Sequence, residues 1–139
     1  STKGRYSLRV LIDLAEHYNG SYIPMKDVAK RQEISLKYLE KILPVLTRGN
    51  LIEGVHGKGG GYRLTKEPDK YNVWEILYLA EGGLAPVACL ERDAKPCARA
   101  AECRTLTMWK QYYMMTKEFF SGITIADLMK ADISDNYVI

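Results

Sequence analysis

The chain has 139 residues, of which 47% are hydrophobic and 27% charged, a composition that supports a packed core and argues against intrinsic disorder. No stretch approaches the roughly 20 apolar residues of a membrane span, and the start lacks a secretory signal pattern, so we expect a soluble, cytoplasmic protein. The net charge of +3 divides unevenly, with twelve Lys/Arg against six Asp/Glu in residues 1–66 and eight against eleven in residues 67–139, which weakly favours a polyanionic partner, although small folds also divide charge by chance.

Three helices are predicted in the first third of the chain. Apolar residues recur at helical spacing over residues 2–18, and a shorter helix follows over residues 25–32. Ser35 then caps a third helix that runs to about residue 48. Pro44 predicts a kink or an early end of this helix, because proline lacks a backbone donor and clashes with the preceding turn. The apolar stripe of the third helix consists of Leu36, Leu39, Leu43 and Leu46.

A β-hairpin is predicted after these helices. Residues 51–56 alternate like a strand, residues 57–61 form a glycine-rich turn, and residues 62–65 return. The turn lacks the G-x-x-x-x-G-K-[ST] spacing of a nucleotide-binding loop and lies between strands rather than before a helix. An ordinary hairpin turn remains the simpler alternative, although such a turn rarely needs four glycines. Three helices followed by such a hairpin have the order of a winged helix-turn-helix.

The second half of the chain is predicted to hold a helix, a cysteine-containing loop and a long helix. The first helix covers residues 72–82, and the loop covers residues 86–104. The long helix covers residues 105–121 and is apolar over much of its circumference, which in so small a domain indicates that one face meets a second copy. Thr124 caps a short helix that runs to residue 129, and residues 132–139 are poorly specified.

The third predicted helix carries polar residues suited to duplex DNA. In a helix-turn-helix, the N-terminal part of the second helix of the motif enters the major groove. Lys37 and Lys41 can donate to guanine, and Ser35 can serve a base or a phosphate. Glu40 can accept from the cytosine amino group, and because phosphates repel a carboxylate that reads no base, it is the candidate for sequence specificity. The alternative is a solvated partner of Lys37 and Lys41.

The predicted hairpin tip is a second candidate contact with DNA. Its glycines allow the backbone to approach a groove closely. Lys58 can contact a phosphate, and His56 can reach the minor groove. Together with the third helix, the tip would give the basic half of the chain two points of contact.

Three cysteines, Cys89, Cys97 and Cys103, fall within fifteen residues. In an intracellular chain, this clustering favours metal or redox chemistry over a disulfide framework. Zinc and iron–sulfur clusters both accept thiolates and usually need a fourth ligand. The spacing contains no C-x2-C pair, which disfavours zinc, and three ordinary thiols explain the spacing alone equally well.

Four motifs carry a family resemblance: Thr2-Lys3-Gly4-Arg5-Tyr6; Ile34-Ser35-Leu36 with Tyr38-Leu39-Glu40; Gly59-Gly60-Gly61-Tyr62; and the three-cysteine loop ahead of Trp109. In these motifs and their order, over nearly the whole chain, the sequence resembles the iron–sulfur cluster regulator (IscR-like) family of winged helix-turn-helix transcription regulators. The resemblance implies a homodimer formed through the long helix after the loop. It also implies binding to double-stranded DNA at a palindromic operator, and sensing of iron–sulfur status, nitric oxide, iron or cysteine supply.

The resemblance further implies that Cys89, Cys97 and Cys103 ligate a 2Fe–2S cluster. Leu106 stands where the namesake of the family has a histidine as the fourth ligand, so the fourth ligand here is unknown. His56 stands where the namesake has an arginine, so reading of the minor groove is expected to be weaker or pH-dependent. The candidates for the fourth ligand are a carboxylate of the partner subunit, a small exogenous molecule, Glu91, Asp93 or Glu102.

The same resemblance implies that Ser35, Tyr38 and Glu40 lie at the DNA, with two lysines beside them. The complete set of predicted DNA-contacting residues is Ser35, Lys37, Tyr38, Glu40, Lys41, His56, Lys58 and Arg5. The predicted fold is mainly α with a small β-hairpin, a winged helix-turn-helix plus a long C-terminal dimerisation helix. The predicted organisation is a winged helix-turn-helix DNA-binding region (residues 1–66), a helix and cysteine-containing cluster loop (residues 67–104), and the dimerisation helix with the C-terminal tail (residues 105–139).

We therefore expect a DNA-binding transcription regulator, a repressor, that senses iron–sulfur cluster status. One alternative is a cluster-free repressor of the same fold that responds through thiols or to a metabolite. Another is a winged helix used for protein contacts, which would show no salt-dependent binding to duplex DNA. An enzyme is not expected, because no Ser or Cys nucleophile has a nearby histidine and no carboxylate pair stands in a recognisable motif.

Overall fold

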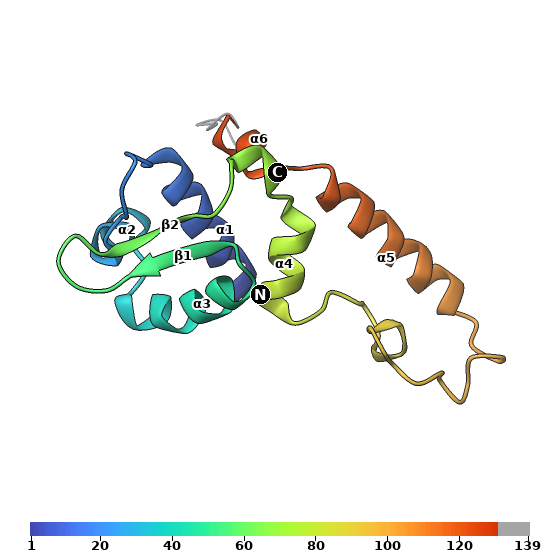
Figure 1. The fold of residues 1–139 in the computed structure, drawn as a ribbon. Helices are drawn as coiled ribbons and strands as arrows, with labels where there is room; N and C mark the ends of the chain where they lie inside the picture. Colours follow the sequence, from blue (N-terminus) through green and yellow to red (C-terminus); the bar gives the residue numbers. More distant parts are fainter. Residues whose placement is uncertain (131–139) are drawn as a thin grey trace.

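The computed structural model describes residues 1–130, so the C-terminal tail predicted over residues 132–139 lies outside the described residues. Figure 1 shows a head, which comprises residues 1–82 and the last helix, and an arm, residues 83–121, that extends away from it. Within residues 1–130, no helix has the length and hydropathy to traverse a lipid bilayer. The elements are α1 (Thr2–Glu16), α2 (Met25–Gln32), α3 (Leu36–Arg48), β1 (Ile52–Val55), β2 (Gly61–Leu64), α4 (Val73–Glu81), α5 (Leu106–Ser121) and α6 (Ile125–Met129), with short 3-10 turns at Pro68–Lys70 and Ala88–Leu90.

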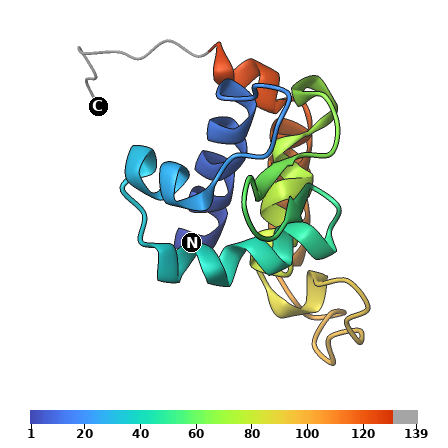
Figure 2. The same ribbon diagram turned by 60° about the vertical axis from the view of Figure 1, so that its left-hand side comes forward.

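The head is built around α1, which contacts α2, α3, α4, α6 and β2. Figure 2 shows α2 and α4 on opposite sides of α1, with α3 crossing below α1 and α6 above it. Burying each large aliphatic side chain stabilises the fold by about 1.5–3 kcal/mol, so this shared core holds α2, α3 and α4 in one unit. The core side chains include Val10, Leu11, Leu14, Val28, Leu39, Leu46, Ile76 and Ile125, each fully or almost fully buried.

Side-chain caps fix where three helices begin. The Ser35 hydroxyl accepts a hydrogen bond from the Tyr38 amide at 3.1 Å, so α3 starts where the sequence predicts. Asn72 caps α4 in the same way. At α6, Thr124 and Asp127 form a reciprocal capping box with bonds of 2.9 and 3.0 Å.

The third helix runs to Arg48, as predicted, but one residue of its predicted apolar stripe is wrong. Of the kink or early end predicted at Pro44, the early end does not occur, because α3 continues through Pro44. Pro44 lies on the exposed side, as does Glu40, so water can satisfy the Glu40 carbonyl that proline leaves without an amide partner. Leu36 is 47% exposed and does not join the core, where Ile42, 4% exposed, takes its place.

The hairpin has an additional backbone partner. Strands β1 and β2 pair antiparallel, from Ile52 with Leu64 to Val55 with Gly61. The segment before α2 also pairs with this hairpin, because Ile23 and Tyr62 exchange two backbone hydrogen bonds of 2.9 Å. Gly61 has φ +146°, and a Cβ atom there would overlap the Ile23 carbonyl, so this position requires glycine.

The arm contains α5, which has two apolar faces. One face, with Trp109, Tyr113 and Phe120 half-buried, packs on α4, where Tyr113 lies 5.6 Å from Trp74 between ring centroids. No α5 residue is fully buried in the described chain. The other face, called the α5 stripe, is 51–69% exposed and consists of Met108, Tyr112, Met115 and Phe119.

Candidate nucleic-acid interface and cysteine loop

The first turns of α3 present the polar side chains predicted to read DNA. Lys37, Glu40 and Lys41 are exposed, and their spacing of three and four residues puts them on one side of the helix. The Ser35 hydroxyl already accepts the capping bond, so its remaining hydrogen-bonding capacity is what faces outward. No ion pair within residues 1–130 joins Glu40 to a lysine, and its carboxylate is therefore available to a ligand.

Tyr38 differs from these neighbours because it is half-buried. Its ring packs edge-on against Tyr6 of α1, with centroids 5.1 Å apart and planes at 79°. Arg5, the last residue of the predicted DNA-contacting set, precedes Tyr6 and is exposed. The structure thus brings the N-terminal motif of the sequence next to the start of α3.

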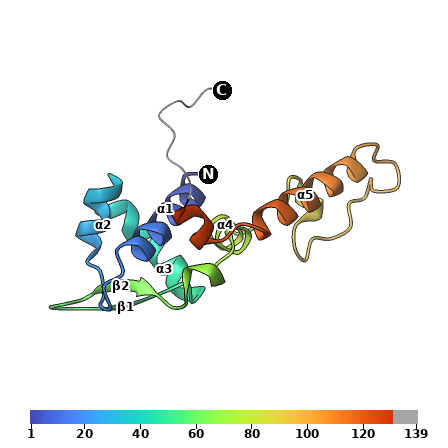
Figure 3. The same cartoon turned by 90° about the horizontal axis from the view of Figure 1, so that it is seen from above.

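The hairpin loop and the start of α3 lie at the same end of the head (Figures 1 and 3). His56 and Lys58 are exposed in that loop. Gly57 and Gly59 adopt φ of +90° and +76°, and nothing lies within 4 Å of a Cβ atom at either position. The tip is thus open on its outer side. His56 and Lys58 lie at the same end of the head as the polar residues at the start of α3.

A polar network that the sequence did not reveal lies behind this interface. Asp13 of α1 is buried, and Arg31 of α2 donates to its carboxylate at 2.7 and 3.0 Å. These hydrogen bonds, helped by attraction to the Asp13 charge, raise the pKa of Arg31. Taken singly, Asp13 and Arg31 look like ordinary charged residues on solvated helix faces. The signal in the sequence that could have revealed the network is that Asp13 stands at a position of α1 that faces the core.

The three cysteines lie on the segment between α4 and α5. Cys89 is half-buried in the short 3-10 turn, Cys97 and Cys103 are exposed, and none forms a disulfide. The Cys103 sulfur lies 3.6 Å from the Thr105 hydroxyl at the start of α5. Hydrogen bonds from the side chain and backbone of Thr105 lower the pKa of the Cys103 thiol, which favours the thiolate that metals require.

The donor chemistry of this loop fits an iron–sulfur cluster, but the loop is spread out. Thiolates are the ordinary ligands of such clusters. Within residues 1–130, no three His, Cys, Asp or Glu side chains lie close enough together to hold a metal ion, so the loop would have to draw together around one. Of the predicted fourth ligands, Glu91 is half-buried and points at Gly83, whereas Asp93 and Glu102 are exposed.

Comparison with known proteins places the chain among transcription regulators. A family model described as "Rrf2: Iron-dependent Transcriptional regulator" matches residues 1–131. The chain is 37% identical over 130 residues to protein rrf2 of Nitratidesulfovibrio vulgaris, covering 94% of this chain and 86% of that protein. It is 32% identical over 129 residues to the HTH-type transcriptional regulator IscR of Aliivibrio salmonicida, covering 93% and 76%.

Solved structures lead to the same group. CymR, described as the global cysteine regulator of B. subtilis, superposes with a TM-score of 0.74 at 31% identity, over 95% of this chain and 97% of that one. T. potens IscR superposes with a TM-score of 0.71 at 31% identity, over 94% and 85%. With the winged helix-turn-helix seen in the head, these matches show that the chain belongs to the Rrf2 family of iron-dependent transcriptional regulators and is a DNA-binding regulator, not an enzyme.

Proposed function

We propose that the chain is a homodimeric repressor that senses iron–sulfur status through a 2Fe–2S cluster held by Cys89, Cys97 and Cys103. It reads a palindromic operator through α3 and the hairpin loop. The observation that carries this proposal is that all three thiols lie on the segment joining the DNA-reading head to α5. A group bound there is linked in the chain to both the part that reads DNA and the part that pairs the subunits.

The proposed DNA interface rests on exposure and charge. Lys37, Glu40 and Lys41 are exposed on α3, and His56 and Lys58 are exposed at the hairpin tip. A major groove about 12 Å wide admits a helix, and a hairpin beside it reaches a phosphate or the adjacent minor groove. The excess of basic residues in residues 1–66 supplies the attraction to phosphate that such binding needs.

The proposed dimer rests on the α5 stripe. Its four members repeat at intervals of four, three and four residues, so they form one continuous face of the helix. This face is separate from the one that packs on α4, and within one chain it stays in water. Pairing two stripes places two heads on one duplex, where half-sites of a palindrome repeat about every 34 Å.

In the proposed sensor, the bound cluster determines the course of the segment between α4 and α5. When bound, the cluster supplies a group whose presence depends on iron and sulfide supply. Cys89 lies eight residues after α4 ends at Glu81, and Cys103 lies three residues before α5 begins at Leu106. Holding three thiols together therefore fixes how α5 leaves the head. Because paired helices must match the operator spacing, this placement alters DNA affinity.

Anaerobic purification, a visible spectrum and iron and sulfide analysis test the cluster. We expect charge-transfer bands with about two irons and two sulfides per chain, lost when all three cysteines are replaced by alanine. Leu106→His, which supplies the histidine that IscR has at this position, is expected to slow cluster loss in air. Operator affinity that is the same with and without the cluster would contradict the switch.

The second candidate is a cluster-free repressor of the same fold that responds to thiol oxidation or a metabolite. Exposed Cys97 and Cys103 favour it, as does Leu106 at the position of the family histidine. The relative described as a global cysteine regulator is similar over nearly its whole length. A protein with three titratable thiols that remains colourless after reconstitution would establish this candidate and exclude the cluster.

A further inference from the structure

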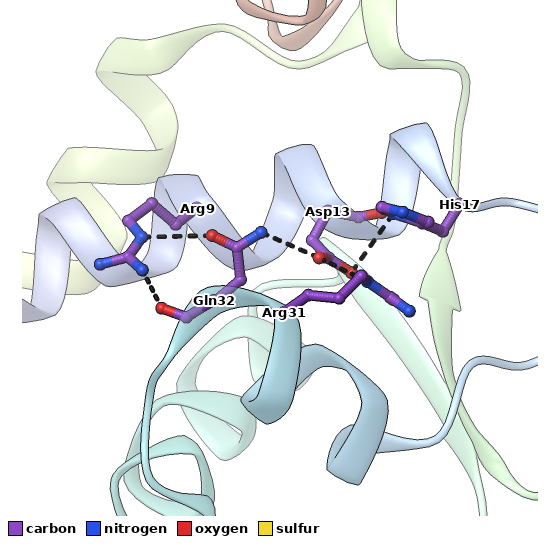
Figure 4. A network of polar contacts seen from close by, with 5 residues as sticks. All are labelled: Arg9, Asp13, His17, Arg31 and Gln32. Atoms are coloured by element: carbon purple, nitrogen blue, oxygen red, sulfur yellow. Dashed lines mark hydrogen bonds and ion pairs between the residues drawn. The ribbon is translucent and has the colours of Figure 1, made fainter.

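The network around Asp13 joins α1 to the end of α2 (Figure 4). Asp13 is 1% exposed, and a buried carboxylate is costly unless partners satisfy it. Arg31 donates two hydrogen bonds to it, and the Gln32 amide donates a third at 2.9 Å. Just after α1 ends, His17 lies with Nδ1 at 2.9 Å from the Asp13 carbonyl. The carboxylate thus takes all three of its hydrogen bonds from the last turn of α2.

Gln32 is the residue at which this network reaches the turn of the helix-turn-helix. Its side-chain oxygen accepts from Arg9 Nε at 3.2 Å, and its backbone carbonyl accepts from Arg9 Nη2. Gln32 ends α2, and the next residue, Glu33, has φ +54°. Two residues later Ser35 caps α3. Both the side chain and the backbone of the residue that opens the turn are therefore held by α1.

A second contact from α1 meets the other end of the turn. The Arg9 guanidinium lies 5.1 Å from the centre of the Tyr6 ring. Tyr6 in turn packs edge-on against Tyr38, in the first turn of α3. Contacts from α1 therefore hold the chain on both sides of the turn, from the end of α2 to the start of the DNA-reading helix.

These contacts determine geometry more than stability. The apolar core already holds α1, α2 and α3 together, and a buried ion pair often adds little to the free energy of unfolding while favouring one arrangement. Bidentate contacts to bases require donors and acceptors within a few tenths of an ångström. A small rotation of α3 would leave contacts with phosphate possible and disrupt contacts with bases.

We propose that Gln32, held between Asp13 and Arg9, is a positioning residue that sets the angle of α3 and thereby the sequence discrimination of the protein. It does so without touching DNA. The inference rests on α3 reading bases as proposed above. It predicts that loss of the Gln32 amide reduces specific binding and leaves non-specific binding unchanged.

Gln32→Met tests this, because methionine keeps the length and neutral charge and cannot bridge Asp13 and Arg9. The probe is a duplex selected by the wild-type protein from a random pool, compared with a scrambled duplex over a range of salt. We expect the ratio of specific to non-specific affinity to fall at least about tenfold, with the salt slope unchanged. Thr124→Ala, at the remote cap of α6, is the control and should lower the melting temperature without changing the ratio. A lower melting temperature with an unchanged ratio in Gln32→Met would overturn the proposal.

Arg9→Lys covers the case in which Gln32→Met does not fold. It keeps the charge but loses the two-point contact with Gln32, and a smaller fall in the ratio is expected. Amide exchange at Tyr38 gives a readout without DNA, and faster exchange relative to the core of α1 is expected in both variants. If the wild type selects no duplex, base reading by α3 is wrong, and unchanged Tyr38 exchange separately rejects the positioning role.

Discussion

Glu40 is the only acidic residue of α3, and it lies on the exposed side between Lys37 and Lys41. Placed against a polyanion, its carboxylate is repelled by phosphates and attracted only by a donor such as the cytosine amino group. Lys37 and Lys41, in contrast, are attracted to the phosphates of any duplex, whatever its sequence. In the proposed interface, affinity and selectivity are thus divided between neighbouring side chains of one helix.

At this scale we predict that Glu40→Ala relaxes base preference at one position of each half-site and leaves non-specific affinity equal or higher. Selection of duplexes from a random pool, followed by titration at several salt concentrations, measures both. Lys37→Ala is the matched control and should weaken binding to all sequences and reduce the salt slope by about one. Equal losses for Glu40→Ala on every sequence would contradict base reading.

At the scale of residues, the sequence singles out side chains whose chemistry is rare, and their roles stay predictions. Three clustered thiols and a glycine-rich basic tip stand out in any chain. Gln32 and Arg9 do not, because an amide and a guanidinium on helices usually face water. Their role depends on Asp13 being buried, which only the packing of α1 against α2 decides.

At the scale of the elements, the stability of α6 depends on a capping box that contains a titratable carboxyl group. The pKa of the Asp127 carboxyl is lowered because it accepts a hydrogen bond from the Thr124 amide. Ile125 of α6 is buried in the core with α1, so fraying of α6 exposes apolar surface in the head. The state of one surface carboxylate is therefore coupled to the stability of the head.

We predict that Asp127→Ala lowers stability at pH 7 and that the difference from wild type narrows in acid. A carboxyl with a lowered folded pKa stabilises the fold fully above its unfolded pKa of about 3.9, and this stabilisation is lost as pH falls through the folded pKa. Urea unfolding at pH 7 and near pH 3 measures the difference. Asp69→Ala, which removes an exposed acid from a 3-10 turn that has no side-chain capping bond, is the control and should lower stability at pH 7 less than Asp127→Ala.

Element boundaries followed from local signals, and pairing between distant segments did not. Ser35 and Thr124 cap helices through hydrogen bonds of their own side chains, so the starts of α3 and α6 could be predicted from the sequence. The exchange of hydrogen bonds between Ile23 and Tyr62 joins residues far apart in the chain, and no local pattern encodes it. Pro44 does not end α3, because the cost of a proline depends on whether the freed carbonyl meets water, and that follows from tertiary position.

For the whole molecule, the two apolar faces of α5 have different roles. The sequence shows only that the helix is apolar over much of its circumference. This predicted that one face meets a second copy, but it did not tell which face. The structure separates them, because Tyr113 packs on Trp74 while the α5 stripe stays exposed. The α5 stripe is therefore the surface that we propose for the second copy.

We predict that Met115→Glu converts the protein to monomers and weakens operator binding by at least about tenfold, because a charge at the centre of an apolar interface costs several kcal/mol and each half-site then binds alone. Sedimentation and operator titration measure both effects. Lys110→Glu places the same side chain on the opposite face and should leave the dimer intact. A dimeric Met115→Glu protein would show that the subunits pair elsewhere.

The bridge between Ile23 and Tyr62 constrains the DNA as well as the protein. It ties the base of the hairpin to the entry of α2, so the hairpin and the helix-turn-helix are fastened to each other beyond their own connection. In the proposed binding mode, the fold then fixes the distance between the groove that α3 enters and the groove or phosphate that the hairpin loop contacts. One base pair inserted between these two positions in a half-site rotates them apart by about a tenth of a helical turn, and a rigid reader cannot follow. The operator should therefore tolerate base changes inside a half-site better than changes in its length.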